Sequence, residues 1–547
     1  MVKKKNLLIL VPIILAFMLW FLHLKLFYTS FLVFSDTAKF ADVARNFALG
    51  NGFSTGFSNF GIGKVLEEAG LFFSARGILP FYPLVIAFFF KLFGVSDAIV
   101  IWTSGMFYTL SALVIYLLGK KIFGQLVGIL AALAFIFDPA MLTYATSGAS
   151  ESLFIFELIL AALLFYTNNK KTVFFGFLTL VALYFTRPSA IIYIAGLILL
   201  FILLSFKKRP QIFKAVGIAV FIWLIIEMVL IKLSGRFFPY SPLRSFLYGT
   251  AKFSPLSAST ETLRGGMAAV GFQLKPFITK FFYNLYNFYK LLPQILSPYL
   301  AGFYLLSLFR WEEAREKKIF RGLVLFFVLA TFFAAAATLP IYRYLHPIIP
   351  FVYLLAVEML VWIAREISKS EFLNSKQIQI FKSQNSKIVI IATSLIFVFV
   401  AGQTLGKIFL DSRYLQAHTN QDKPPVYVKL AWLLKENTKP DDLIITNLDT
   451  WGSWYGQRRT IWYPLEPSQL IPPSGKELKV DAIYLTSYKI DDENYYMGGS
   501  WRKMFYNPEK LEDKFFADNF EIAGKFEIKA EETYEKEAAV AVLLKRK

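Results

Sequence analysis

Two acidic residues stand where a carboxylate can do chemistry at a membrane surface. Asp36 lies a few residues after a long apolar run and opens a segment in which alanines recur at helical spacing. Glu151 follows the sequence Ser-Gly-Ala-Ser and starts another apolar run. A carboxylate so placed can take a proton from a hydroxyl group as a general base. Each residue can instead be a plain helix-start acid, Asp36 as an N-cap and Glu151 as a partner of the helix dipole.

The two carboxylates can also work as a pair. If both end membrane spans on one face, a helical bundle can bring Asp36 and Glu151 together, to share a divalent metal ion or to act as base and partner. Glu67 and Glu68 lie in the same loop as Asp36 and are further candidates for binding substrate. With three His and no Cys, the sequence excludes a His-rich or thiolate metal centre.

Arginines near the ends of apolar runs supply the opposite charge. Arg187 lies in Thr-Arg-Pro, and Arg343 lies in Tyr-Arg-Tyr-Leu-His-Pro together with His346. A guanidinium group can pair with a carboxylate or hold a phosphate through two hydrogen bonds. We expect Arg343 and His346 to bind substrate, with Arg187 as a second cation.

The composition places these residues in a membrane protein. The 547 residues are 56% hydrophobic and 18% charged, with a mean hydropathy of +0.51, which is too apolar for a water-soluble enzyme. About 20 apolar residues suffice for a helix to cross a bilayer. The expected spans are the eleven runs near 6–28, 98–118, 126–145, 151–167, 172–187, 189–206, 213–233, 283–309, 321–339, 343–364 and 387–409.

Charge predicts the orientation of these spans. A twelfth apolar run, Ile78–Phe93, is short and contains two prolines and a lysine, so we expect it to lie in the membrane interface. If it does not span and the N-terminus is cytoplasmic, every short basic loop falls on the cytoplasmic side, as the positive-inside rule favours. The loops 29–97 and 234–282 and the C-terminal part then face outward from a plasma membrane.

The net charge of +20 is unevenly distributed. From residue 411 onward the chain holds 20 Lys and Arg against 22 Asp and Glu, so the basic excess lies in residues 1–410. This pattern fits cytoplasmic loops and anionic lipids better than nucleic acid, and we expect no nucleic-acid partner. The sequence therefore predicts a transmembrane domain, 1–410, and a soluble extracytoplasmic domain, 411–547.

The C-terminal part has the pattern of a small α/β domain. A helix is expected at Val426–Leu434, and strands at Leu443–Thr446, Ala482–Leu485 and Ala538–Leu544. Its conspicuous feature is the aromatic segment Trp451–Arg459. That segment is either a packed aromatic turn or a platform for a sugar or a lipid headgroup.

Four motifs follow one another along the chain. They are Asp36 with its Ala-rich helix and Gly50-Asn-Gly52, the proline segment Leu79–Gly94, Tyr116–Gly124 followed by Asp138-Pro139 and Ser150-Glu151, and Arg343–Pro350. In this order they resemble the GT-C superfamily of polytopic glycosyltransferases, in particular the aminoarabinose lipid A transferases and the protein O-mannosyltransferases. The resemblance covers about residues 6–410. Two departures are visible: Asp36 is followed by Thr37 where many members have Glu, and Glu151 stands where Asp is common.

The resemblance implies a GT-C fold and an enzyme that moves a hexosyl or pentosyl group from a polyprenyl-phosphate donor to a lipid, glycan or protein acceptor on the outer face. Asp36 would be the general base, and Glu151 would orient the acceptor or help hold a divalent metal ion. Arg343, with Arg187, would neutralise the departing lipid phosphate. Tyr82, in the proline segment, is a further candidate for binding substrate.

Two other functions stay open. An oligosaccharyltransferase-like enzyme is one, because Trp451–Gly456 faintly resembles that family's Trp-Trp-Asp-Tyr-Gly motif but lacks the Asp. A transporter or flippase of lipid-linked glycans is the other, because Glu157, Glu227 and Glu358 lie inside apolar runs, where acids can relay ions. The sequence has no internal repeat of the kind that transporters usually show.

Overall fold

The protein, seen in a computed structural model, divides into two compact units. Unit 1 comprises Met1–Leu26, Ile101–Val229 and Phe281–Leu415, and unit 2 comprises Phe27–Val100, Leu230–Lys280 and Gln416–Lys547. The described residues are 2–27, 31–59, 73–75, 78–205, 209–234, 274–310, 314–338, 341–369, 384–410, 423–448, 450–464, 466–470, 479–491 and 497–547.

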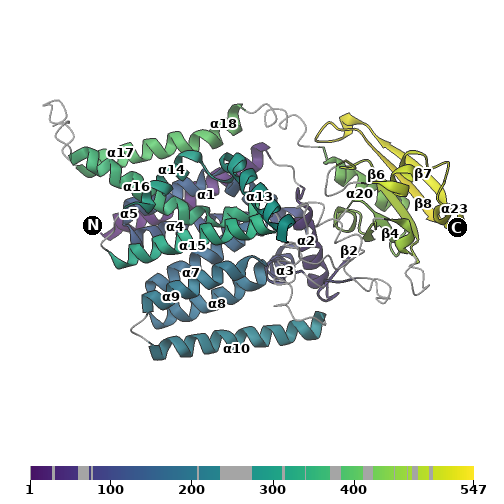
Figure 1. The fold of residues 1–547 in the computed structure, drawn as a ribbon. Helices are drawn as coiled ribbons and strands as arrows, with labels where there is room; N and C mark the ends of the chain where they lie inside the picture. The colour runs from purple at the N-terminus through teal and green to yellow at the C-terminus, as the bar shows by residue number, and fades with distance from the viewer. Residues whose placement is uncertain are drawn as a thin grey trace. The chain divides into compact units, whose positions relative to one another are not determined.

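Unit 1 is built from helices (Figure 1). Each of the eleven apolar runs expected from the sequence coincides with one helix or with consecutive helices. The first residues of α4 and α13 and the last residues of α10 are assigned to unit 2. The helices are α1 (Val2–Phe27), α4 (Asp97–Ile122), α5 (Gln125–Ile136), α6 (Pro139–Ser147), α7 (Glu151–Thr167), α8 (Lys170–Thr186), α9 (Ala190–Ser205), α10 (Arg209–Ser234), α13 (Leu274–Ile295), α14 (Pro298–Leu308), α15 (Arg315–Ala337), the 3-10 helix η2 (Tyr342–Ile348), α16 (Ile349–Lys369), α17 (Gln384–Ile396), the π-helix η5 (Phe397–Ala401) and α18 (Gly402–Leu410).

Fewer helices than expected meet the length of a membrane span. Among the described residues, α4, α15 and the continuous stretch Tyr342–Glu366 are long and apolar enough to cross a membrane. The pairs α5–α6 and α13–α14 bend by 61° and 113°, and counting each pair as one span gives five. The expected number of eleven is therefore not confirmed, because helices such as α7, α8 and α9 have 16 or 17 residues.

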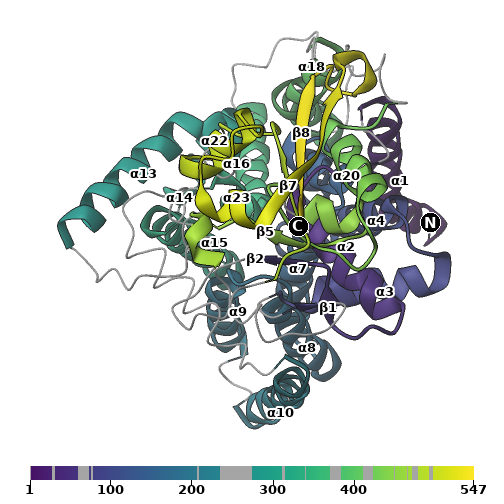
Figure 2. The same ribbon diagram turned by 90° about the vertical axis from the view of Figure 1, so that its right-hand side faces the viewer.

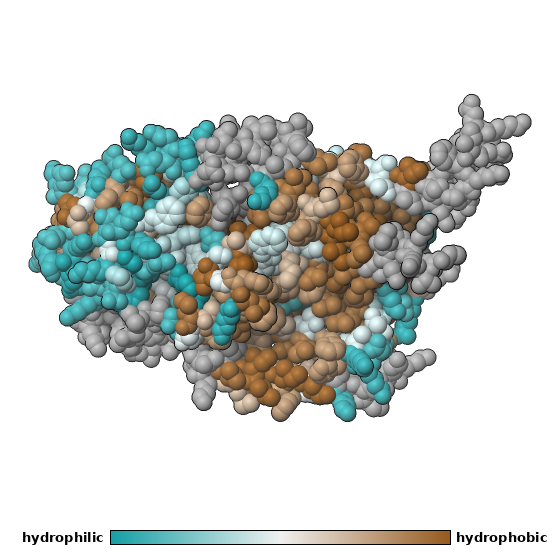
Figure 3. Space-filling model, turned by 180° about the vertical axis from the view of Figure 1, so that it is seen from behind, coloured by the Kyte–Doolittle hydropathy of each residue, from teal (hydrophilic) through white to brown (hydrophobic). Residues whose placement is uncertain are grey.

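The surface of unit 1 is strongly apolar. Phe213, Phe221 and Met228 of α10 are exposed by 75%, 63% and 61%, and Phe309 is exposed by 81%. Figure 3 shows hydrophobic residues gathered in a broad brown area over the helices. Soluble proteins rarely expose contiguous apolar patches larger than a few hundred Å². This surface therefore suits contact with lipid, in agreement with an integral membrane protein.

Close packing of α1 on α4 depends on a glycine. A Cβ atom built on Gly105 would lie 2.2 Å from the indole ring of Trp20, so a larger residue cannot occupy this position without moving the ring. The Trp20 indole N–H also donates a 3.0 Å hydrogen bond to the carbonyl oxygen of Ala145, in α6. This buried tryptophan thus links α1 to both α4 and α6.

Unit 2 contains a six-stranded mixed sheet in the order β2-β5-β4-β6-β8-β7 (Figure 2). Strands β2, β5, β4 and β6 are parallel, and β8 is antiparallel to both β6 and β7. The strands are β2 (Phe57–Asn59), β4 (Leu443–Thr446), β5 (Arg459–Trp462), β6 (Ala482–Thr486), β7 (Phe520–Ile528) and β8 (Ala539–Arg546), beside a separate pair formed by β1 (Ser54–Thr55) and β3 (Phe73–Ser74). The helices are α2 (Ser35–Ala48), α3 (Phe81–Phe93), α20 (Val426–Asn437), α21 (Thr450–Trp454), α22 (Gly499–Tyr506) and α23 (Lys514–Asn519), with short 3-10 helices η6 (Pro467–Leu470) and η7 (Ala530–Glu532).

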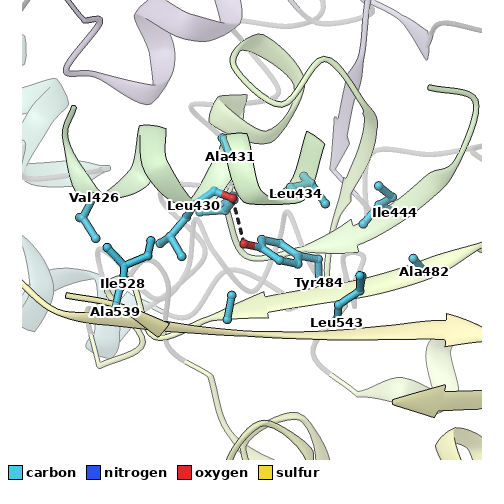
Figure 4. Close-up of a cluster of buried hydrophobic side chains, with 12 residues drawn as sticks. Val426, Leu430, Ala431, Leu434, Ile444, Ala482, Tyr484, Ile528, Ala539 and Leu543 are labelled. Atoms are coloured by element: carbon cyan, nitrogen blue, oxygen red, sulfur yellow. Dashed lines mark hydrogen bonds between the residues drawn. The ribbon is translucent and has the colours of Figure 1, made fainter. Parts of the chain in front are cut away.

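Helix α20 covers the core of this sheet. Leu430 and Leu434 are fully buried, and they belong to one apolar cluster with Tyr484 of β6 and Leu543 of β8 (Figure 4). The Tyr484 hydroxyl donates a 2.9 Å hydrogen bond to the carbonyl oxygen of Leu430. The phenol thus brings a large apolar ring into the core while its polar atom is satisfied, as buried tyrosines require.

A strand from the N-terminal half of the chain completes one edge of the sheet. Strand β2 pairs with β5, with Phe57 opposite Thr460 and Asn59 opposite Trp462. The Thr460 backbone N–H also donates a 2.8 Å hydrogen bond to the carbonyl oxygen of Gly56. Pairing of this kind satisfies the backbone groups that an edge strand leaves open. The unit that holds the sheet therefore includes Phe57–Asn59, from the first outer loop expected in the sequence.

Candidate functional site

Helix α7 of unit 1 begins with a buried carboxylate. Gly148 ends α6 with φ at +73°, a left-handed conformation that glycine adopts without strain. The chain then turns through Ser150 into α7, whose first residue is Glu151. Glu151 is only 3% exposed, so its charge must be compensated by nearby groups. The N-terminal end of the helix dipole supplies part of that compensation.

Two arginines supply the rest. Arg187 directly follows α8. Its Nη1 atom lies 2.6 Å from Oε1 of Glu151 and also donates a 3.2 Å hydrogen bond to the Ser150 hydroxyl. Nε of Arg343, in η2, lies 3.8 Å from the same carboxylate oxygen. The centres of both guanidinium groups lie within 6 Å of the Tyr344 ring. We call Glu151, Arg187, Arg343 and Tyr344 the arginine cluster.

The arginine cluster carries net positive charge. Two guanidinium groups face one carboxylate, so the formal charges of its members sum to +1. The side chains of Arg187 and Arg343 retain 13% and 25% of their exposure, whereas Glu151 is buried. An anion can therefore approach the guanidinium groups from the exposed side. Guanidinium forks match phosphate oxygens in geometry, and a phosphate is thus the anion that this cluster suits.

A buried tyrosine–histidine pair belongs to the same end of unit 1. The Tyr144 hydroxyl, in α6, is hydrogen-bonded to Nδ1 of His346, in η2. The two side chains are 5% and 1% exposed, so this contact lies inside the helical packing. His346 therefore joins η2 to α6, three residues along the chain from Arg343. Nothing in the spacing of the sequence singles out Tyr144, since the pair is 202 residues apart.

Ser104 of α4 fixes the turn that presents Glu151. Its fully buried hydroxyl oxygen lies 2.8 Å from the carbonyl oxygen of Tyr144, 3.0 Å from that of Ala149 and 3.0 Å from the Ser152 hydroxyl. These groups are the end of α6, the turn itself and the start of α7. The hydroxyl has one proton, so it donates to one of these acceptors at a time, and the Tyr144 carbonyl also accepts from the backbone N–H groups of Gly148 and Ala149. Ser104 thus adds a donor at the buried carbonyl of Ala149, inside the turn.

Replacement of Ser104 by Ala should lower the free energy of unfolding by about 1–3 kcal/mol, because it takes a donor away from the buried carbonyl group of Ala149. The matched control is Ser111→Ala, which removes an equally buried hydroxyl of α4 whose hydrogen bond goes to the carbonyl of Phe107, one turn earlier in the same helix. Thermal unfolding of both variants in the same detergent would test this. Equal unfolding temperatures would refute the role assigned to Ser104.

Asp36 and Tyr82 belong to unit 2. Asp36 lies in the first turn of α2 and is half-buried. The alanines that predicted this helix, Ala38, Ala41 and Ala44, are fully buried on its inner face. Tyr82 of α3 is also fully buried, with its ring edge-on to Phe40 of α2 at 5.6 Å. Tyr82 thus contributes to the packing of α3 on α2.

The expected residues fall into three groups. Arg187 and Arg343 both contact Glu151, and His346 lies on the same short helix as Arg343. Asp36 and Tyr82 lie in the other unit, so the expected proximity of Asp36 and Glu151 stays a prediction. Glu67 and Glu68 lie outside the described residues.

The described residues offer no group of three or more His, Asp or Glu side chains that could hold a metal ion. Glu151, one of the two expected ligands, already has two guanidinium groups at its carboxylate. A divalent cation at the same oxygen would stand beside two positive charges, which electrostatics disfavours. Glu151 in this arrangement therefore does not fit a metal ion, and we assign no chemical step to one.

The family comparison is consistent with the expected resemblance. Residues 78–232 match the family described as dolichyl-phosphate-mannose-protein mannosyltransferase. No curated protein matches the chain. The matched residues include α4 through α9 and contain both Glu151 and Arg187.

Two solved structures with TM-scores above 0.5 share the fold. The archaeal oligosaccharyltransferase AglB from Archaeoglobus fulgidus, in complex with an inhibitory peptide and a dolichol-phosphate, is 12% identical, with a TM-score of 0.54 over 90% of this chain and 71% of that one. The apo form of the Archaeoglobus fulgidus oligosaccharyltransferase is 13% identical, with a TM-score of 0.52 over 89% and 70%. ArnT from Cupriavidus metallidurans bound to undecaprenyl phosphate is 11% identical, with a TM-score of 0.48 over 98% and 97%. The resemblance to GT-C membrane glycosyltransferases is thereby confirmed at the level of family match and fold.

Proposed function

We propose that this chain, which has the fold of the GT-C membrane glycosyltransferases, transfers a glycosyl group from a polyprenyl-phosphate donor to an acceptor hydroxyl. The observation that carries the proposal is the arginine cluster, a net positive and partly exposed group at the end of the helical unit. The family match to a dolichyl-phosphate-mannose-dependent transferase and the dolichol-phosphate named with AglB support a lipid phosphate as its ligand.

The donor's phosphate is the part that the arginine cluster would bind. When the bond between the anomeric carbon and the phosphate oxygen breaks, negative charge collects on the departing polyprenyl phosphate. Arg343 and Arg187 would stabilise that charge through charge-assisted hydrogen bonds, which are strongest where water is excluded. Glu151 would hold the guanidinium groups in place, a role that fits its contacts better than orienting the acceptor.

The acceptor requires a base, and we assign that role to Asp36. Its carboxylate would take the proton of the acceptor hydroxyl while that oxygen forms a bond to the anomeric carbon. The products are the glycosylated acceptor, the polyprenyl phosphate and a protonated Asp36, which returns its proton to water. Because the phosphate is already a good leaving group, a base and two cations suffice for this reaction.

The proposed orientation follows from charge. The N-terminus would be cytoplasmic, and the sheet-bearing C-terminal part would face the outside of the plasma membrane, with eleven spans between them. The basic excess in residues 1–410 supports this orientation through the positive-inside rule. The transferred group would then be a hexosyl or pentosyl unit delivered to a lipid, glycan or protein on the outer face.

An oligosaccharyltransferase-like activity is the second candidate, because the fold is shared with AglB. The aromatic segment that favoured it in the sequence is a packed turn here: Trp451 and Trp454 are 2% and 6% exposed. The transporter alternative is weakened by Glu358, which forms an ion pair with Arg310.

The proposal can be tested by a turnover assay on the purified protein in nanodiscs. A panel of radiolabelled polyprenyl-phosphate monosaccharides would be offered with membrane extract as acceptor, beside a lipid-linked oligosaccharide with an acceptor peptide. We expect label to move from one monosaccharide donor to the extract. Transfer only from the oligosaccharide donor would establish the second candidate. No transfer, together with movement of lipid-linked glycan across liposome membranes, would establish a flippase.

A further inference from the structure

The short helix α21, with the following Tyr455, contacts several segments of residues 31–100, among them α2, α3 and the start of α4. It lies next to α2, the helix that carries Asp36, and it belongs to the same compact unit. Trp451, Ser453 and Trp454 are all buried. We call residues 450–455 the aromatic turn. A buried aromatic turn with so many partners is suited to fixing the position of its neighbours.

The aromatic turn holds both ends of α2. At the start of that helix, the Thr450 hydroxyl donates a 2.6 Å hydrogen bond to the carbonyl oxygen of Ser35, the residue directly before Asp36. Near its end, the Arg45 guanidinium donates hydrogen bonds of 3.1 Å to the Ser453 carbonyl oxygen and 3.0 Å to that of Trp454. The helix is therefore bound to the turn at positions ten residues apart.

The guanidinium group of Arg45 has further contacts that hold its orientation. It forms an ion pair with the buried carboxylate of Asp42, and its guanidinium group lies 4.8 Å from the centre of the Trp454 ring. The second Asp42 oxygen accepts hydrogen bonds from the Thr55 hydroxyl, at 2.8 Å, and the Gly56 backbone N–H, at 2.7 Å. A guanidinium group held on three sides cannot shift without moving α2.

The other side of the turn is bound to the beginning of α4. The Trp454 indole N–H donates to one oxygen of Asp97 at 2.7 Å, and the Tyr455 hydroxyl donates to the other at 2.8 Å. Tyr455 also accepts a 2.7 Å hydrogen bond from the Leu32 backbone N–H. Burial, and then the Asp97 charge, raise the pKa of the Tyr455 phenol well above its usual value, so its hydroxyl stays a donor.

We propose that Thr450 and Arg45 are positioning residues, through which the aromatic turn holds α2 in the orientation that Asp36 needs for catalysis. This inference rests on the proposed function, in which Asp36 is the general base. It gives the sheet-bearing part of the chain a role in the chemical step, although neither positioning residue needs to touch substrate.

The test compares two threonine substitutions. Thr450→Val keeps the shape of the side chain but removes the donor to Ser35, whereas Thr450→Ser keeps the donor. We expect Thr450→Val to lower kcat about 10- to 100-fold, as small displacements of a catalytic group do. The KM for the donor should change less than about twofold, because the arginine cluster is untouched. Thr450→Ser should restore most of the wild-type kcat.

Matched controls separate positioning from folding. Thr533→Val removes an equally buried hydroxyl that donates to a backbone carbonyl and accepts from the Glu537 backbone N–H, in the segment between β7 and β8, and should leave kcat near wild type. Arg45→Gln is the second test variant, and its control is Arg502→Gln, which breaks an ion pair with Asp491 in the same unit. Stoichiometric donor binding measures the folded fraction of each variant. A loss of folded protein lowers binding and kcat together, whereas lost positioning lowers kcat alone.

Hydrogen exchange gives a readout that does not depend on turnover. We expect the amides of residues 38–48 to exchange faster in Thr450→Val and Arg45→Gln than in their controls. Wild-type kcat in both variants, with Asp36→Asn inactive, would overturn the positioning inference and leave the proposed function standing. Full activity of Asp36→Asn would instead overturn the proposed function on which the inference rests.

Discussion

Asp36→Asn should lower kcat by about 10²- to 10⁴-fold, the usual contribution of a general base. Asparagine has nearly the shape of aspartate but cannot accept the proton of the acceptor hydroxyl. Expression and donor binding should stay near wild type, because the groups assigned to the lipid phosphate are Arg187 and Arg343. The measurement is single-turnover transfer from the donor identified in the assay described above, with donor binding followed in parallel.

The matched control for this variant is Asp518→Asn, the same change on an exposed carboxylate of α23. It should transfer at the wild-type rate. A second comparison, Asp42→Asn, changes a fully buried carboxylate of α2 and should lower stability by weakening the ion pair with Arg45. Normal turnover by Asp36→Asn would remove the base assignment, whatever the other variants do.

The second large effect concerns Arg187 and Arg343, which lie at different distances from the Glu151 carboxylate. Arg343→Ala should raise the KM for the donor about 10- to 100-fold, since a hydrogen bond to a charged group contributes about 1.5–3 kcal/mol. Its unfolding temperature should change little, because Glu151 keeps Arg187 at 2.6 Å. Arg187→Ala removes that contact and should also destabilise the fold by about 3–5 kcal/mol, the cost of leaving a buried charge without its partner.

Donor titration by turnover and thermal unfolding, measured on the same preparations, would separate the two variants. Arg315→Ala is the control, since it replaces an exposed arginine at the start of α15 that bonds only the Leu203 carbonyl among the contacts described. An unchanged donor affinity in Arg343→Ala would give Arg343 a structural role. Equal stability of the two arginine variants would contradict the division of labour within the arginine cluster.

Local sequence patterns predicted the elements of this protein well. Each of the eleven apolar runs coincides with helices, and the strand expected at Leu443–Thr446 has those bounds as β4. Asp36 and Glu151 were placed at helix starts, and both lie in the first turn of a helix. These features depend on residues within a few turns of one another, which periodicity, alanine spacing and turn residues describe directly.

Span lengths were predicted less well. Apolar composition marks a helix, but it does not tell whether the helix bends or stops. The 113° bend between α13 and α14 and the 61° bend between α5 and α6 interrupt runs that read as continuous in the sequence. Pro298 and Pro139, each at the start of the second helix, were visible signals for these breaks.

The sequence by itself predicted a helical membrane protein that resembles the GT-C glycosyltransferases, with carboxylates and arginines at the ends of its helices. Only the tertiary structure decided their partners. Glu151 meets Arg187 and Arg343, and Arg45 binds a carbonyl group 409 residues further along the chain, because packing brought those helix ends together. Such contacts depend on the path of the whole chain, and the spacing of neighbouring residues does not encode that path. The sequence left the segment Trp451–Arg459 open as a packed aromatic turn or a binding platform, and only the fold joined the neighbouring Thr450 to the helix that carries Asp36.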